Sequence, residues 1–258
     1  MQKPIYSPQD EQVLMTQLWS SQIADNPETF VLFAFPWGQK NTPLEHFKGP
    51  RAWQRRTLRK IADHIKANRG QMDMDALRRA VSSGRGIGKS ALVSWLILWM
   101  LTTRIGSSVI VSANSENQLR TVTWGELTKW ATMAINSHWW EPSATKLVPA
   151  QWLTELVERD LKKGTRYWAA EGKLWSEENP DSYAGVHNHD GMMVIFDEAS
   201  GIPDGIWSVA AGFFTEKILD RYWFAFSNPR RNTGYFYEAV EGSKRDFWKS
   251  KIIDARTV

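Results

Sequence analysis

The sequence predicts an α/β protein with a mainly parallel central sheet and helices on both faces of that sheet. Strand-like and helix-like runs alternate at 77–83, 89–104 and 107–113, which is the pattern of parallel β-α-β units. The run 89–104 is almost entirely apolar, as expected for a helix packed between a sheet and a further layer. Two later apolar runs, 191–200 and 221–229, have the composition of buried strands and end in polar side chains.

The N-terminal part of the chain is predicted to be helical. Three signals indicate these helices: proline at the start of a helix, proline or glycine at its end, and apolar residues three or four positions apart. They predict helices over 8–24, 28–38 and 50–68.

The remaining elements follow from apolar runs and from helical spacing. A helix is expected to begin near Ser115, and one further strand is expected at 166–172. The residues expected to share the buried face of the Ser115 helix are Leu119, Val122, Leu127, Trp130 and Ala134.

Composition and charge narrow the class of protein. The 258 residues are 42% hydrophobic and include no cysteine, so neither a disulfide framework nor a thiolate metal site is possible. The longest apolar run, Ala91 to Leu101, is too short to span a bilayer, and we expect no contact with membranes. The net charge of +4 is local, because window 51–69 carries +6 and the rest of the chain −2. Such a basic helix is either a solvated face or a surface that contacts phosphates.

The glycine-rich stretch SSGRGIGKS, Ser82 to Ser90, lies between a predicted strand and an apolar helix. It follows the phosphate-binding pattern G-x-x-x-x-G-K-[ST], except that Ser83 stands at the first glycine. The glycines let the backbone turn its N–H groups toward phosphate oxygens, and the helix directs its positive end at them. A tight connection without a ligand is the alternative. The residues predicted to bind nucleotide in this loop are Ser83, Gly84, Arg85, Gly86, Ile87, Gly88, Lys89 and Ser90.

Two adjacent carboxylates, Asp197 and Glu198, follow a fully apolar strand. In an ATP site Asp197, together with Ser90, would hold Mg²⁺, which prefers oxygen ligands. Glu198 would then orient and deprotonate the attacking water, while Lys89 would reach the β and γ phosphates. The alternative is that the acidic pair only caps a following helix. Arg85, inside the loop, is either a catalytic contact to the γ-phosphate or the partner of a nearby carboxylate.

Taken together, these motifs resemble the ATPase half of the large terminase subunit, the DNA-packaging motor of tailed bacteriophages. GPRAWQRRTLRKI resembles the adenine-recognition segment of that family, SSGRGIGKS its deviant phosphate loop, and MMVIFDEAS its catalytic strand. FAFSNPRRNTGYFYE resembles its coupling motif. The resemblance implies that Gln54 contacts adenine, whereas the residues alone favour an exposed side chain. It also implies that Ser227 and Asn228 sense hydrolysis beside the γ-phosphate.

The family implies a P-loop NTPase of the additional-strand, catalytic-glutamate type. Its expected organisation is a helical lid and adenine-binding segment at 1–70 and an ATPase core at 71–258, without the nuclease domain of that family. The implied activity is Mg²⁺-dependent ATP hydrolysis that moves double-stranded DNA into a procapsid, with no nuclease activity from this chain alone. The implied partners are DNA, the portal protein and the small terminase subunit. A homo-oligomeric ring on the procapsid is expected, with a monomer possible for the isolated domain, in the cytoplasm of the infected host and not in the mature virion.

Other functions stay open. A helicase or another nucleic-acid translocase has the same ATP chemistry, a nucleotide-dependent assembly switch would bind without hydrolysis, and a nucleotide kinase would transfer phosphate to an acceptor other than water. Arg55 and Arg59 are the predicted DNA contacts. His187 and His189 are interpreted as part of a polar turn rather than as a metal pair, because no third ligand lies near them in the sequence.

Overall fold

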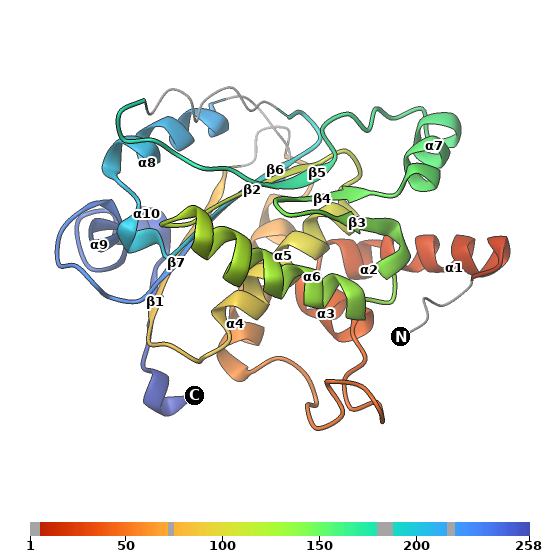
Figure 1. Ribbon diagram of the computed structural model, residues 1–258, viewed down its shortest axis with the longest axis horizontal. Helices are drawn as coiled ribbons and strands as arrows, with labels where there is room; N and C mark the ends of the chain where they lie inside the picture. The colour runs from red at the N-terminus through yellow and green to blue at the C-terminus, as the bar shows by residue number, and fades with distance from the viewer. Residues whose placement is uncertain (1–5, 72–74, 180–187, 216–219) are drawn as a thin grey trace.

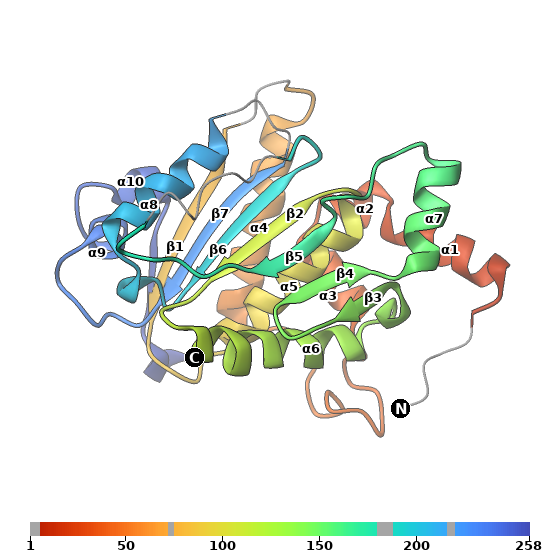
Figure 2. The same ribbon diagram turned by 45° about the horizontal axis from the view of Figure 1, so that its top comes forward.

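The computed structural model describes residues 6–71, 75–179, 188–215 and 220–258. Within these residues an eight-stranded sheet has the order β3-β4-β5-β2-β6-β7-β1-β8, and Figure 2 shows the strands from β1 to β3 side by side. The strands are β1 (Leu77–Ser83), β2 (Ser108–Ser112), β3 (Trp140–Pro142), β4 (Lys146–Pro149), β5 (Ala169–Gly172), β6 (Met192–Asp197), β7 (Arg221–Ser227) and β8 (Lys251–Ile253). The sheet is parallel from β8 to β5, and β3 and β4 extend it as an antiparallel edge.

Strand β7 lies between β1 and β6 and pairs in parallel with both of them. The strand that leads into the glycine-rich loop is therefore separated by one strand from the strand that ends in the acidic pair. This insertion is the additional strand that the family resemblance implied. Because all three strands are parallel, their carboxyl ends at Ser83, Asp197 and Ser227 lie at the same edge of the sheet. The predicted α/β fold class is confirmed.

Alternate residues of the central strands enter two separate hydrophobic cores, as the period of two in a strand requires. Along β6, Met193 and Ile195 face the larger core, whereas Met192, Val194 and Phe196 face the smaller one. Helices α4 (Ala52–Asn68), α5 (Lys89–Thr103) and α6 (Trp124–Met133) cover the first face, and α8 (Asp204–Ala211), α9 (Tyr235–Val240) and α10 (Arg245–Trp248) the second (Figures 1 and 2).

The N-terminal helices pack into the same core as the sheet. They are α1 (Pro8–Leu18), α2 (Ser21–Ala24) and α3 (Pro27–Ala34), and their buried residues share one cluster with α4 and α5. The predicted single helix over 8–24 is wrong, because Ser20 takes an extended backbone conformation and starts α2 anew. None of the helices in the described ranges is long and apolar enough to cross a bilayer.

The helix predicted after Ser115 begins as a π-helix, η1 (Gln118–Thr123), and continues as α6. Its wider turn changes which side chains face the core. Leu119 is buried as predicted, but Val122 is 43% exposed, so its predicted burial is wrong. The same turn directs Thr123 toward the acidic end of β6.

Several short elements carry no clear sequence signal and were not predicted. The edge strands β3, β4 and β8 have three or four residues, too few to establish a period of two. Helix α7 (Gln151–Asp160) and helices α8 to α10 follow loops and were not predicted either.

Candidate functional site

The glycine-rich loop connects β1 to α5, as predicted. Gly86 and Gly88 have φ values of +73° and +87°, a region that residues with a side chain rarely adopt. A Cβ atom on Gly88 would also lie 2.8 Å from Nε2 of Gln54. Both the backbone conformation and the close approach of Gln54 therefore require glycine at this position.

Side chains at the start of α4 hold the loop by hydrogen bonds to its backbone carbonyls. Arg51 Nη1, Trp53 Nε1 and Gln54 Nε2 donate hydrogen bonds to the carbonyls of Gly86, Ile87 and Gly88, at 3.1, 2.9 and 2.8 Å. Gln54 is only 3% exposed, so the exposed position that the residues alone favoured is wrong. Three successive carbonyls point toward α4, and the opposite side of the loop faces the cavity described below.

Lys89, the first residue of α5, directs its ammonium group back across the loop. Its Nζ donates to the carbonyl of Gly84 at 2.8 Å, to Oγ of Ser83 at 3.1 Å and to Oδ1 of Asn228 at 2.7 Å. Burial lowers the pKa of Lys89, and the nearby carboxylates of Asp197 and Glu198 partly offset that effect. This environment favours an anionic ligand at Lys89.

Asp197 lies at the end of β6 and is 4% exposed. Its Oδ2 accepts a hydrogen bond from Thr123 Oγ1 at 2.8 Å, and its Oδ1 accepts one from the backbone N–H of Glu198 at 3.0 Å. Burial raises the pKa of Asp197, while these two hydrogen bonds lower it in part. The carboxylate is thus held in one orientation at a site where a bound cation would stabilise its charge.

Glu198 stands in the left-handed region with a φ of +53°, which is uncommon for a residue with a side chain. Its Oε2 lies 3.0 Å from Nη2 of Arg230, on the loop after β7. The two side chains are 26% and 43% exposed, so this ion pair lies at the rim of the site. Backbone strain of this kind gathers at functional sites.

These residues line one cavity of about 410 Å³ that opens at the carboxyl edge of the sheet. The predicted residues that line it are Arg85, Gly86, Ile87, Gly88, Lys89, Ser90, Asp197, Glu198 and Asn228. Ser83 accepts a hydrogen bond from Lys89, which lines this cavity. Gln54 lines a neighbouring cavity of about 310 Å³ together with several aromatic side chains, among them Trp37, Phe47 and Trp95. Both cavities include Gly88, Ala91 and Glu126, so they are adjacent.

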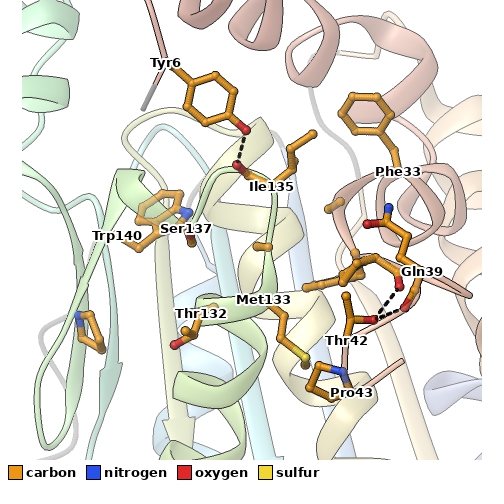
Figure 3. A pocket seen from close by; sticks show the side chains of 16 residues that line it. Tyr6, Phe33, Gln39, Thr42, Pro43, Thr132, Met133, Ile135, Ser137 and Trp140 are labelled. Carbon is orange, nitrogen blue, oxygen red and sulfur yellow. Dashed lines mark hydrogen bonds between the residues drawn. The ribbon is translucent and has the colours of Figure 1, made fainter. Parts of the chain in front are cut away.

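Figure 3 shows a different cavity, of about 460 Å³, between the end of α6 and the loop after α3. Tyr6 Oη closes one side of it with a hydrogen bond to the carbonyl of Ile135 at 3.0 Å (Figure 3). Within the described part of the chain its lining residues are all uncharged, and it contains none of the predicted site residues. It does not suit a phosphate ligand.

The predicted DNA contacts lie on the outer side of α4. Glu28 accepts hydrogen bonds from Arg55 Nε at 2.6 Å and from Arg59 Nε at 2.5 Å, which connects α3 to α4. Burial alone would raise the pKa of Glu28, but the hydrogen bonds and charges of the two arginines outweigh burial and lower that pKa. The arginine side chains stay 44% and 55% exposed, and their contact with DNA remains a prediction.

Sequence reasoning missed several residues of the site. Thr123 gave no signal because its role depends on the π-helix. Arg51 and Trp53 lie in the stretch that resembles the adenine-recognition segment, but their hydrogen bonds to the loop were not predicted because the partners lie about 35 positions away. Arg230 had a weak signal, as a charged residue inside the stretch assigned to the coupling motif. Within the described ranges, no group of three or more His, Asp or Glu side chains forms a metal cluster, and His187 lies outside these ranges.

The order of strands and the position of the glycine-rich loop and of the acidic pair define a P-loop NTPase of the additional-strand type. No protein-family model matches the chain. One curated relative, described as "Probable terminase, large subunit" of Enterobacteria phage P7, is 32% identical over 165 residues. That alignment covers 62% of this chain and 30% of the relative, so the chain matches less than a third of the relative's length. The similarity confirms the resemblance to large terminase subunits that the motifs predicted.

Two groups of solved structures are also similar. The large terminase of a thermophilic bacteriophage, in complex with ADP, aligns with 88% of this chain and 44% of its own, at 14% identity and a TM-score of 0.47. The ATPase domain of the Thermus phage P74-26 large terminase aligns with 68% of this chain and 66% of its own, at 21% identity and a TM-score of 0.44.

Proposed function

We propose that this chain is the ATPase part of a phage large terminase subunit, and that it hydrolyses ATP to move double-stranded DNA into a procapsid. The observation that carries the proposal is the meeting of Lys89, Asp197 and Glu198 in one cavity beside a glycine-rich loop. The curated relative supports the family, and the partial alignment leaves the activity of the whole protein as a proposal.

The two adjacent cavities suit the two ends of ATP. The phosphates would bind over the loop beside Lys89 and Arg85, where an ammonium and a guanidinium group face the cavity. The adenine would enter the neighbouring cavity, whose aromatic side chains offer stacking surfaces. The Gln54 amide keeps one N–H and a lone pair beyond its contacts to Arg51 and Gly88, and these could bind the edge of adenine.

The oxygen donors at the end of β6 fit Mg²⁺. Each carboxylate oxygen of Asp197 accepts one hydrogen bond, so lone pairs remain on both, and Ser90 adds a hydroxyl in the same cavity. Bound there, the ion would neutralise part of the phosphate charge. Thr123 would act as a positioning residue, because it fixes the carboxylate that binds the ion.

In the proposed reaction, water attacks the γ-phosphorus of ATP in line with the bond to the leaving oxygen. A new P–O bond forms while the bond to the β-γ bridging oxygen breaks, which yields ADP and phosphate. Glu198 accepts a proton from the water and later releases it to solvent or product. Lys89 and Arg85 stabilise the charge that develops, and Asn228, already bonded to Lys89, is placed to respond to loss of the γ-phosphate.

The partners follow from the family and are part of the proposal. They are double-stranded DNA, contacted by Arg55 and Arg59, the portal protein and the small terminase subunit. The chain would work as one member of a ring on the procapsid, in the cytoplasm of the infected host.

The test is Mg²⁺-dependent phosphate release from ATP over a range of protein concentrations. Glu198→Gln should abolish release, and Glu116→Gln, a change at an exposed glutamate outside the site, should leave it unchanged. A rate per chain that rises with concentration would support a ring. Binding of ATP without release by the unaltered chain would instead favour the assembly switch, and transfer of phosphate to an acceptor other than water would favour a kinase. Separation of DNA strands, rather than movement of intact duplex, would favour a helicase.

A further inference from the structure

The loop that follows β7 contacts both sides of the phosphate cavity. Asn228 Oδ1 accepts a hydrogen bond from the Lys89 ammonium at 2.7 Å, and Arg230 Nη2 pairs with the Glu198 carboxylate at 3.0 Å. Ser227, which precedes Asn228, is hydrogen-bonded through its hydroxyl to Ser200, the second residue after the acidic pair. Three contacts therefore connect one short segment to the loop and to the catalytic strand.

Two of these contacts occupy groups that the proposed reaction needs. Lys89 would bind phosphate oxygens, but here it donates to an amide oxygen. Glu198 would accept a proton from water, but here its carboxylate is paired with a guanidinium group. An incoming γ-phosphate carries more negative charge than a carboxylate and offers several acceptor oxygens, so it competes for the same guanidinium.

Arg230 can change partner without disturbing the sheet. Residues 229–233 are exposed, whereas β7 is buried along its whole length. The Arg230 side chain is 43% exposed, and among the described residues Glu198 is its ion-pair partner. The Arg230 guanidinium lies 3.0 Å from Glu198, which lines the cavity, so a γ-phosphate bound there would lie close to it.

We propose that Arg230 is a further catalytic residue of this site, which pairs with Glu198 when no γ-phosphate is bound and transfers to the γ-phosphate oxygens when ATP binds. The inference rests on the proposed function and adds the means by which the site distinguishes ATP from ADP. Transfer releases Glu198 to act on water only when there is a phosphate to attack. It also brings a second guanidinium, besides that of Arg85, to the charge that develops in the reaction.

The first test compares binding of ADP with binding of a non-hydrolysable ATP analogue that has an imido group between the β and γ phosphates, measured by calorimetry. Arg230→Gln should weaken binding of the analogue roughly tenfold or more, the loss expected for one charge-assisted contact, and should leave ADP binding within about twofold. Arg231→Gln, a change at the neighbouring exposed arginine, should alter neither. Arg230→Lys should recover part of the loss.

The second test measures whether Glu198 and Arg230 compete. Glu198→Gln removes the partner that Arg230 must leave, so this variant should bind the analogue more tightly than the unaltered chain. In the Arg230→Gln background the gain from Glu198→Gln should be smaller, because only the repulsion between carboxylate and phosphate is then relieved. An equal or larger gain in that background would overturn the transfer.

The outcomes separate the two proposals. If the unaltered chain binds neither nucleotide, the proposed function fails and the inference fails with it. If both nucleotides bind and Arg230→Gln weakens both equally, or neither, the ATPase proposal stands and the role of Arg230 is wrong. Tighter binding of the analogue or faster phosphate release by Arg230→Gln would make Arg230 an inhibitory contact only, which also overturns the transfer.

Discussion

The hydrogen bond from Thr123 to Asp197 should stabilise the fold measurably, because donor and acceptor are both buried. Thr123 is 1% exposed, and its hydroxyl lies 2.8 Å from an acceptor that carries a charge. Thr123→Val keeps the shape of the side chain and removes only the donor. The free energy of unfolding should fall by about 2 kcal/mol, since a hydrogen bond to a charged group contributes roughly 1.5–3 kcal/mol.

Urea unfolding followed by tryptophan fluorescence measures this change. The matched control is Thr121→Val, two residues earlier, whose hydroxyl donates to the exposed carbonyl of Asn117 and should change stability by less than about 0.5 kcal/mol. In the Asp197→Asn background the cost of Thr123→Val should fall to about 1 kcal/mol, the value of a neutral hydrogen bond. An equal cost in both backgrounds, or a cost no larger than that of the control, would refute the reasoning.

The remaining predictions concern α4 and the loop. The pKa of Glu28 is lowered in the folded protein, so its contribution to stability is present above the unfolded pKa and is lost as the pH falls through the folded pKa. Glu28→Gln should therefore be less stable than the unaltered chain at neutral pH, and the difference should become smaller in acid. Acid unfolding curves of the two proteins measure this difference. Gly88→Ala should lower the free energy of unfolding by about 1–2 kcal/mol and weaken ADP binding. The control, Gly125→Ala, lies within α6 with open space around it and should leave stability unchanged or raise it by about 0.5–1 kcal/mol. Thermal unfolding measures the stabilities, and calorimetry measures ADP binding. If Arg55 and Arg59 contact DNA phosphates, changing both to Gln should make the salt dependence of DNA affinity shallower by up to about 1.8 in log–log slope, and an unchanged slope would contradict the contact.

The central part of the fold could be predicted because its signals are local. The strands β2, β6 and β7 contain apolar runs with clear ends, and β1 and α5 stand directly before and after a recognisable loop. The acidic pair could be assigned to the same site as the loop because two carboxylates at the end of a buried strand suit the Mg²⁺ of a nucleotide site. These parts of the site needed no knowledge of distant contacts.

The rest of the site depends on partners that are distant in the sequence. Nothing near Thr123 shows that a π-helix will turn its hydroxyl toward a residue 74 positions later. In the sequence, the neighbours of Gln54 are those of a surface residue on a helix. Its side chain is buried only because the loop approaches it in the folded protein. Likewise, the pairing of Arg230 with Glu198 requires β7 to lie next to β6. The order in which the strands follow one another along the chain does not show which of them are neighbours in the sheet.

The net positive charge of α4 does not by itself show that the helix binds nucleic acid. The window 51–69 carries +6, yet Arg51 donates to the loop, Arg55 and Arg59 share Glu28, and Arg69 pairs with Asp25. Much of the charge that indicated a nucleic-acid surface thus stabilises the protein itself. The helix nevertheless joins two places that the proposed motor must connect, because its first turn holds three carbonyls of the phosphate loop and its next two turns carry the half-exposed arginines. A shift of the loop on nucleotide binding would therefore move both guanidinium groups, since a single continuous helix carries them.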